Sequence, residues 1–234
     1  MQTHWRLAFM FDAPNRSLPP FEQALLKARS EIQANAASYG VRIGVADRPV
    51  DQEAGKQAGS ETGPGEVDGA IEISIANESI ADAPGICMAL SPLLASLAEP
   101  GTLQVMTGPM FHMVPVRRGQ CFLSLSFRRD PATSSAQFRD WWYNQHSTLA
   151  IPVLGEGLLA YDQVHVDAQA SRQAADALGV PYVEYDAYDN LTWADLAAYH
   201  HSISEPVGMA RVFADEVGRI DKTSTRHAMM RDIG

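Results

Sequence analysis

The ten residues FRDWWYNQHS, at positions 138–147, hold the densest group of side chains that could take part in chemistry. Phe138, Trp142 and His146 follow one another at intervals of four, so on a helix they share one face. An imidazole among aromatic rings is a candidate general acid or base. The same spacing is typical of a helix that buries aromatic side chains against a sheet, with a histidine near its C-terminal end where a positive charge suits the dipole. The helix alone leaves both interpretations open.

A strand predicted over residues 158–167 supplies a second set of polar side chains. Its residues alternate with period two, which places Tyr161, Gln163 and His165 on one face. That face is polar for the interior of a sheet protein, and buried polar groups need hydrogen-bond partners or a ligand. We therefore expect it to line the inside of a barrel.

Two further strands are predicted to add polar groups to this interior. In the strand expected over 181–189, Tyr182 and Glu184 share a face, and Glu184 beside His165 would form an acid–base pair. The last strand, expected over 224–233, presents His227. For each residue the alternative is an ordinary polar side chain at a strand end.

The elements that carry these residues follow a similar order in the two halves of the chain. The first half is predicted to contain strands at 4–12, 41–47, 69–76 and 101–116, helices at 19–40 and 79–99, and a polar loop at 48–68. We expect Pro84 and Pro92 to break or kink helix 79–99, and Gly108-Pro109 to interrupt the extended segment 101–116.

The second half is predicted to contain the strands already named and one at 121–129. Helix 135–148 begins with a capping box of Ser134 and Gln137. Residues 168–180 are predicted to be a polar connection. A helix over 191–200, capped by Asp189 or Asn190, is followed by a helical segment at 205–218.

The order predicts an α+β fold of two β-α-β-β-α-β repeats, residues 1–117 and 118–234, each a ferredoxin-like unit. Such a unit carries its helices on one face of an antiparallel sheet and leaves the other face bare. Two bare faces close on each other as a barrel with the helices outside. Closure within one chain or between two chains of a homodimer are both compatible with the sequence.

Composition excludes several classes of function. The net charge of −10 argues against nucleic acid, and the chain has no run of 18 apolar residues that would span a membrane. We see no signal peptide and no Cys/His cluster with metal-ligand spacing, and expect a cytoplasmic protein without a metal. The adjacent His200 and His201 cannot share a helix face, so they do not suggest a joint metal site.

The segment RRDPATSSAQFRDWWYNQHSTLAIPV, followed by AYDQVHVD, resembles the EthD family of the dimeric α+β barrel superfamily. The residues that carry the resemblance are Arg129, Pro131, Phe138, Trp142, His146, Pro152, Tyr161, Gln163 and His165, with Glu184 matching a glutamate often seen in the third strand. The resemblance covers residues 118–232. The first half keeps only the phenylalanine, as Phe21, and has Leu25 and Arg29 at the other two positions. It is interpreted as a degenerate copy that completes the barrel.

The resemblance implies a lyase or isomerase without an organic cofactor, acting by proton transfer on a hydrophobic, oxygenated or aromatic small molecule. His146 would be the general acid or base, with His165 or Glu184 as its partner. Substrate contacts would come from Trp142, Tyr161, Gln163, Phe122, Tyr182 and His227. The alternatives are a binding protein without catalysis, a cofactor-free monooxygenase, and a haem protein with His146 or His165 as axial ligand.

Overall fold

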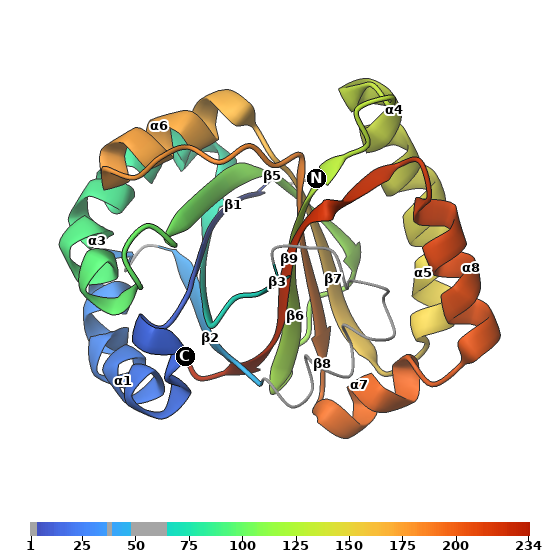
Figure 1. Ribbon diagram of the computed structural model, residues 1–234, viewed down its shortest axis with the longest axis horizontal. Helices are drawn as coiled ribbons and strands as arrows, with labels where there is room; N and C mark the ends of the chain where they lie inside the picture. Colours follow the sequence, from blue (N-terminus) through green and yellow to red (C-terminus); the bar gives the residue numbers. More distant parts are fainter. Residues whose placement is uncertain (1–3, 37–38, 48–64) are drawn as a thin grey trace.

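The computed structural model describes residues 4–36, 39–47 and 65–234, and within them eight antiparallel strands close into one barrel (Figure 1). The first half contributes β1 (His4–Phe11), β2 (Gly40–Ala46), β4 (Gly69–Ala76) and β5 (Gln104–Val114). The second contributes β6 (Cys121–Arg129), β7 (Leu158–His165), β8 (Ala187–Trp193) and β9 (Ile220–Asp232). A two-residue strand, β3 (Gly65–Glu66), pairs in parallel with β9.

Both halves have the same strand order, β2-β4-β1-β5 in the first and β7-β8-β6-β9 in the second. Antiparallel pairing of β5 with β7 and of β2 with β9 joins the halves at two seams. The predicted α+β barrel of ferredoxin-like repeats is confirmed, and it closes within one chain. The division into domains at residue 117 stays a prediction, because both halves contribute to one barrel.

Ten helical segments among the described residues lie outside the strands in two groups (Figure 1). Helices α1 (Leu18–Asn35), α3 (Ala83–Leu97) and α6 (Ala168–Leu178) cover the first-half strands. The continuous segment α4 (Ser135–Asp140), η3 (Trp141–His146) and α5 (Ser147–Leu154), with α7 (Leu196–Ser202) and α8 (Pro206–Glu216), covers the second-half strands. Short 3-10 turns, η1 (Pro14–Arg16) and η2 (Asn77–Asp82), precede α1 and α3.

Residues Ala168–Leu178 form helix α6, and the prediction of a polar connection with at most one helical turn was wrong. The Asp167 side chain caps the helix by accepting a hydrogen bond of 2.8 Å from the Ala170 amide. The buried stripe is made of Ala174, Ala175 and Leu178, and small alanines in a polar segment give a weak periodic signal. Although α6 follows β7 of the second half, it packs on α3 and β5 of the first.

The buried clusters show which face of each strand looks into the barrel. One cluster joins residues of strands from both halves and of no helix, among them Met10, Met106, Phe122, Val164 and Met230, so these side chains fill the lumen. The opposite strand faces pack under the helices. Because Val164 points into the lumen, its neighbours Tyr161, Gln163 and His165 on the alternate positions point outward under the helices. The prediction that this polar face lines the barrel interior was wrong.

The third strand of the second half lies further along the chain than predicted. Residues 181–186 form no strand, and β8 runs over Ala187–Trp193, through the start of the helix expected over 191–200. Every residue of β8 is buried, because it pairs with β6 and β7 and is covered on both faces. Asp189 and Asn190 are therefore strand residues, and α7 begins after Asp195, which caps it.

The helix predicted over 79–99 divides into η2 and α3 just before Pro84, as expected, whereas the interruptions expected at Gly108-Pro109 and at Pro92 do not end their elements. Strand β5 runs through Gly108-Pro109, where the strands approach so closely that a Cβ at Gly108 would lie 2.1 Å from the His165 carbonyl oxygen. Pro84 stands at the start of α3, while Pro92 lies within α3 without ending it. The loop predicted at 48–68 falls mostly outside the described residues; of its end, Gly65 and Glu66 form β3.

Candidate active site

A cavity of about 170 Å³ lies in the second half, between the outer face of β6, β7, β8 and β9 and helices α5, α7 and α8. Its wall is mainly apolar and includes Leu125, Leu154, Leu191, Trp193, Val212 and Phe213. Eight of its residues are polar or titratable: His146, Tyr161, Asp189, Tyr199, Glu216, Lys222, Thr225 and His227. An apolar hollow with a few converging polar groups is the usual form of a small-molecule site.

His146 ends η3 and reaches this cavity with an orientation fixed by a carboxylate. Its Nδ1 lies 3.0 Å from Oδ2 of Asp215, which also accepts a hydrogen bond of 3.1 Å from Trp141 Nε1. A carboxylate only accepts, so Nδ1 of the imidazole donates. In the neutral imidazole the other ring nitrogen, Nε2, therefore carries the lone pair; it lies 3.8 Å from Oε1 of Glu216 on the cavity wall. His146 is 6% exposed and ready to exchange a proton through Nε2.

The π-helical turn η3 decides which aromatic residue accompanies His146. The Ser147 amide bonds to the Trp142 carbonyl five residues earlier, the spacing of a π turn. The ring beside His146 is therefore Trp141, five residues before it, at 4.9 Å between ring centroids. Trp142 instead packs beneath the helix on His165, at 5.0 Å and nearly parallel. Trp142 does not line the cavity, because the predicted spacing of four does not hold through this turn.

Asp189, on β8, is a second titratable group on the cavity wall. Burial raises its pKa well above the usual value, and the nearby charge of Glu216 raises it further. Its Oδ1 has no hydrogen-bond partner among the described residues. Burial also raises the pKa of neighbouring Tyr161 well above 10, so for both groups burial favours the protonated form. A neutral carboxyl group can donate a hydrogen bond to an oxygen of a bound molecule.

The floor of the cavity has a third polar position on β9. The register places Asp189, Leu125 and His227 in one row across β8, β6 and β9, so Asp189 and His227 stand two strands, about 10 Å, apart. Burial lowers the pKa of His227, which favours the neutral imidazole. The nearby Thr225 hydroxyl has no partner among the described residues.

Of the residues predicted for the site, His146, Tyr161 and His227 line the cavity. Gln163 lies beneath it and donates hydrogen bonds to the Tyr161 hydroxyl at 2.9 Å and the Trp142 carbonyl at 3.0 Å. It therefore positions Tyr161. His165 is packed between the rings of Trp142 and Phe111, and burial lowers its pKa to about 4.

The other three predicted site residues lie elsewhere. Phe122 is in the barrel lumen, where the guanidinium carbon of Arg42 lies 3.9 Å from the centroid of the Phe122 ring. Glu184 is exposed in the segment before β8, so it cannot pair with His165. Tyr182, in the same segment, packs against Arg172 of α6. Glu184 and Tyr182 lie away from the site because β8 begins at Ala187, after both residues.

Sequence reasoning missed Asp189, Asp215 and Glu216 as site residues. Asp189 was assigned to a helix cap, and the last two stand at the end of α8 with no motif that distinguishes them from a solvent-exposed acidic pair. Only the packing of α8 over the strands brings them to His146. No spacing in the sequence indicates this contact.

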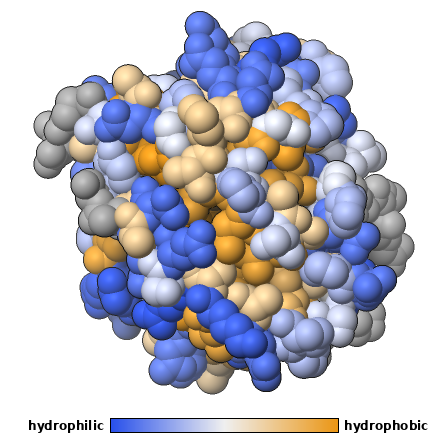
Figure 2. Space-filling model, turned by 90° about the vertical axis from the view of Figure 1, so that its left-hand side faces the viewer, coloured by the Kyte–Doolittle hydropathy of each residue, from blue (hydrophilic) through white to orange (hydrophobic). Residues whose placement is uncertain are grey.

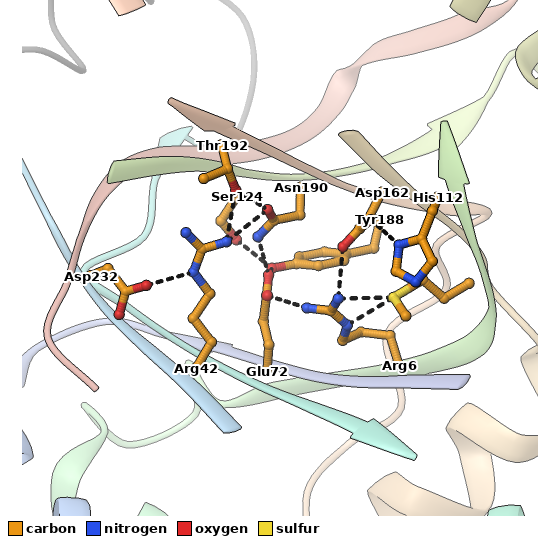
Figure 3. Close-up of polar contacts among 11 residues, drawn as sticks. Arg6, Arg42, Glu72, His112, Ser124, Asp162, Tyr188, Asn190, Thr192 and Asp232 are labelled. Carbon is orange, nitrogen blue, oxygen red and sulfur yellow. Dashed lines mark hydrogen bonds and ion pairs between the residues drawn. The ribbon is translucent and has the colours of Figure 1, made fainter. Parts of the chain in front are cut away.

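The barrel lumen holds a separate polar network, shown in Figure 3. Arg6 lies between Glu72 and Asp162, and Asn190 donates to Glu72 at 2.5 Å. Arg42 bonds to the side chains of Asn190, Thr192 and Asp232. These groups satisfy one another. Among the described residues no group of three or more His, Cys, Asp or Glu is arranged to hold a metal ion.

Comparison with known proteins agrees with this fold. Residues 130–223 match the family profile of the EthD domain. Similar solved structures include an anthrone oxidase-like protein, 8% identical, with a TM-score of 0.61 over 100% of this chain and 92% of the other. A monooxygenase-like protein of Fusobacterium nucleatum subsp. nucleatum is 10% identical, with a TM-score of 0.57 and coverage of 100% and 94%.

A mutant chlorite dismutase from Candidatus Nitrospira defluvii is 9% identical, with a TM-score of 0.52 and coverage of 99% and 91%. At such identities these likenesses show the fold alone. The search of curated proteins finds no match for the chain. The resemblance stated from the sequence is confirmed for the second half, where the cavity lies.

Proposed function

From the EthD domain at residues 130–223, we propose that this protein is a proton-transfer enzyme, a dehydratase, decarboxylase or isomerase, acting on a hydrophobic oxygenated small molecule in the second-half cavity. The observation that supports this most is that a candidate base, His146, and a candidate acid, Asp189, line the same cavity. His146 offers Nε2 as the base, because Asp215 accepts a hydrogen bond from Nδ1 and so leaves the lone pair of the neutral imidazole on Nε2. Asp189 offers a proton, because its pKa is raised. A base and an acid facing one bound molecule are the groups that enolisation needs.

The chemistry follows from these two positions. His146 Nε2 removes a proton from the carbon next to a carbonyl group, while the Asp189 carboxyl donates a hydrogen bond to the carbonyl oxygen, where negative charge develops. Returning the proton from His146 to another carbon completes an isomerisation. Giving it to a departing β-hydroxyl group, which leaves as water, completes a dehydration. In the decarboxylation of a β-keto acid, His146 takes the proton of the substrate's carboxylic acid group, loss of CO₂ then gives an enolate, and the imidazolium returns that proton to the enolate carbon.

The cavity limits the size of the substrate. Its volume of about 170 Å³ is close to the roughly 150 Å³ of an engineered cavity that holds benzene. With mainly apolar walls, the cavity therefore suits one substituted ring or a chain of similar size. Larger substrates require α7 or α8 to move outward.

The cavity does not fit haem as it stands. Typical ligand pockets measure about 300–1,000 Å³, and a haem macrocycle needs more room than this hollow has. Glu216, whose Oε2 pairs with Lys222, places its Oε1 3.8 Å from His146 Nε2, the nitrogen that would bind the iron. His165 is stacked between rings and does not face a cavity. We therefore derive no step through haem.

The test is a hydrogen-exchange assay in D₂O with single-ring ketones, lactones and β-hydroxy ketones, followed by proton NMR. The wild type should exchange the proton next to the carbonyl, or convert the compound, and His146→Gln should slow this by about 100-fold or more. His201→Gln, which changes an exposed histidine of α7, should leave the rate unchanged. Wild-type rates for His146→Gln would contradict the proposal, as would a compound that binds this cavity but neither exchanges nor reacts.

A further inference from the structure

Helix α3 presents an apolar surface that no described element covers. It lies between α1 and α6 on the outside of the first-half strands (Figure 1). Ile86, Leu90 and Leu94 pack inward, whereas the opposite side is exposed. We call this side the α3 outer face; it consists of Gly85, Met88, Ala89, Pro92, Ala95 and Ser96, whose hydroxyl donates to the Leu93 carbonyl of the same helix.

The α3 outer face differs from an ordinary surface helix in its charge. Surface helices carry charged or polar side chains opposite their buried stripe. Residues 83–98 contain none of the chain's 18 basic and 28 acidic residues. Met88 is 65% exposed, and a Cβ added at Gly85 would meet nothing within 4 Å. Figure 2 shows apolar side chains gathered at the centre of this side of the molecule, with polar ones around them.

We propose that the α3 outer face is the contact surface of a homodimer, in which two copies of the chain pack α3 against α3 across a two-fold axis. Charge argues for a second copy as the partner. Two molecules with a net charge of −10 repel each other, and they can approach most closely through a face without charge. A two-fold interface uses the same patch on both copies, so a neutral patch is its own complement.

The residue sizes on this face suit helix-to-helix packing. Gly85 and Ala89 stand one turn apart and leave room for a partner helix at the usual 8–10 Å between axes. Met88, beside them, supplies a flexible side chain that fills gaps in such contacts. With the common crossing angle of about −50°, the centres of the two helices meet and their ends diverge. The exposed Asp82 at the start of the helix then stays in water.

A lipid surface is the competing partner, since Ser79–Leu97 is long and apolar enough to cross a membrane by length and composition. Helices that lie on membranes combine an apolar face with lysines and arginines that meet anionic lipids. Residues 83–98 have none, and Asp82 is acidic. In the fold this segment is divided between η2 and α3, and α3 packs on α1 and α6.

Sedimentation velocity over a range of protein concentrations tests the proposal. The wild type should sediment as a dimer at high concentration, and the double variant Met88→Glu/Ala89→Glu should sediment as a monomer with an unchanged circular dichroism spectrum. Val116→Glu adds a charge at another exposed apolar residue, far from α3 in the chain, and should remain dimeric. A wild type that is monomeric throughout, or a dimeric double variant, would overturn the proposal.

A cross-link tests the geometry separately. Ala89→Cys should form a disulfide-linked dimer under mild oxidation, whereas the wild type should not, because Cys87 and Cys121 are buried and burial raises the pKa of Cys87 to about 12. Neutral and anionic phospholipid vesicles form the last arm. We expect the wild type to co-sediment with neither kind of vesicle. If the wild type did not self-associate but bound vesicles, and the double variant lost that binding, the α3 outer face would be assigned to membranes instead.

Discussion

His165 is a neutral imidazole in the packed layer beneath the candidate site, and this makes stability depend on pH. Its folded pKa of about 4 lies below the ordinary 6.5, so between these values the unfolded chain binds more protons. The contribution to stability is present above pH 6.5 and is lost as the pH falls to about 4. A shift of this size corresponds to about 3 kcal/mol.

Replacing His165 by phenylalanine keeps a ring between Trp142 and Phe111 and removes the titrating group. Urea unfolding from pH 7 to pH 4 should therefore show a shallower loss of stability for His165→Phe than for the wild type. A smaller slope remains, because burial also lowers the pKa of His227. Identical pH profiles for both proteins would refute the neutral, buried imidazole.

Asp215 fixes the direction of His146, so it is a positioning residue. In Asp215→Asn the amide oxygen can still accept from the imidazole but carries no charge to stabilise its protonated form, and we expect proton exchange to slow by about 10- to 100-fold. The pH at which the rate is half-maximal should shift as well. Asp140→Asn alters an exposed carboxylate of the same helical segment and should leave rate and profile unchanged. An unaltered pH profile for Asp215→Asn would assign Asp215 a purely structural role.

At the scale of elements, local signals predicted more than long-range ones. The capping box of Ser134 and Gln137 forms as expected, because it depends on residues three apart. The face of β7 was assigned wrongly because both faces carry polar residues: Asp162 belongs to the lumen network, and Gln163 lies under the helices. The residues around Asp189 and Asn190 are of types that favour caps, and only pairing on both sides makes them a strand.

The close approach of β5 and β7 at their seam gives a prediction for Gly108 of β5. A Cβ at Gly108 would overlap the His165 carbonyl, which is backbone and cannot move aside without separating the strands. Gly108→Ala should therefore lower the free energy of unfolding by about 1–3 kcal/mol or more. At Gly40, near the start of β2, the added Cβ meets Ser74 at an ordinary 3.8 Å, and Gly40→Ala should change stability by at most about 0.5 kcal/mol. Equal effects in urea unfolding would contradict this account.

For the whole molecule, the two halves divide structure and function between them. The first-half sheet is covered by α1, α3 and α6 over a large apolar cluster, while the second half holds the candidate site. The degenerate first copy therefore completes the barrel without repeating the residues of the site. The comparison of the two halves in the sequence indicated this difference, because the first half has Leu25 and Arg29 where the second has Trp142 and His146. The sequence could not show that α6 of the second half packs on the first.

The lumen network connects the two halves through buried ion pairs and hydrogen bonds. Glu72 of the first half is paired with Arg6 and accepts hydrogen bonds from Tyr188 and Asn190 of the second. Removing Glu72 leaves Arg6 with only Asp162 and leaves Tyr188 and Asn190 without their acceptor, and breaking a buried ion pair costs about 3–5 kcal/mol. Glu72→Ala should lower the free energy of unfolding by that amount, measured by urea denaturation with circular dichroism and tryptophan fluorescence.

The control variant is Glu22→Ala, which removes a solvent-accessible ion pair with Arg231. The nitrogen and oxygen of this pair are 2.9 Å apart. Exposed pairs contribute at most about 1 kcal/mol, so this variant should unfold close to the wild type. Coincident transitions by both probes are expected for Glu72→Ala, since the network spans both halves and its loss weakens them together. If Glu72→Ala were no more destabilising than Glu22→Ala, the connection between the halves would have to lie in the two strand seams alone.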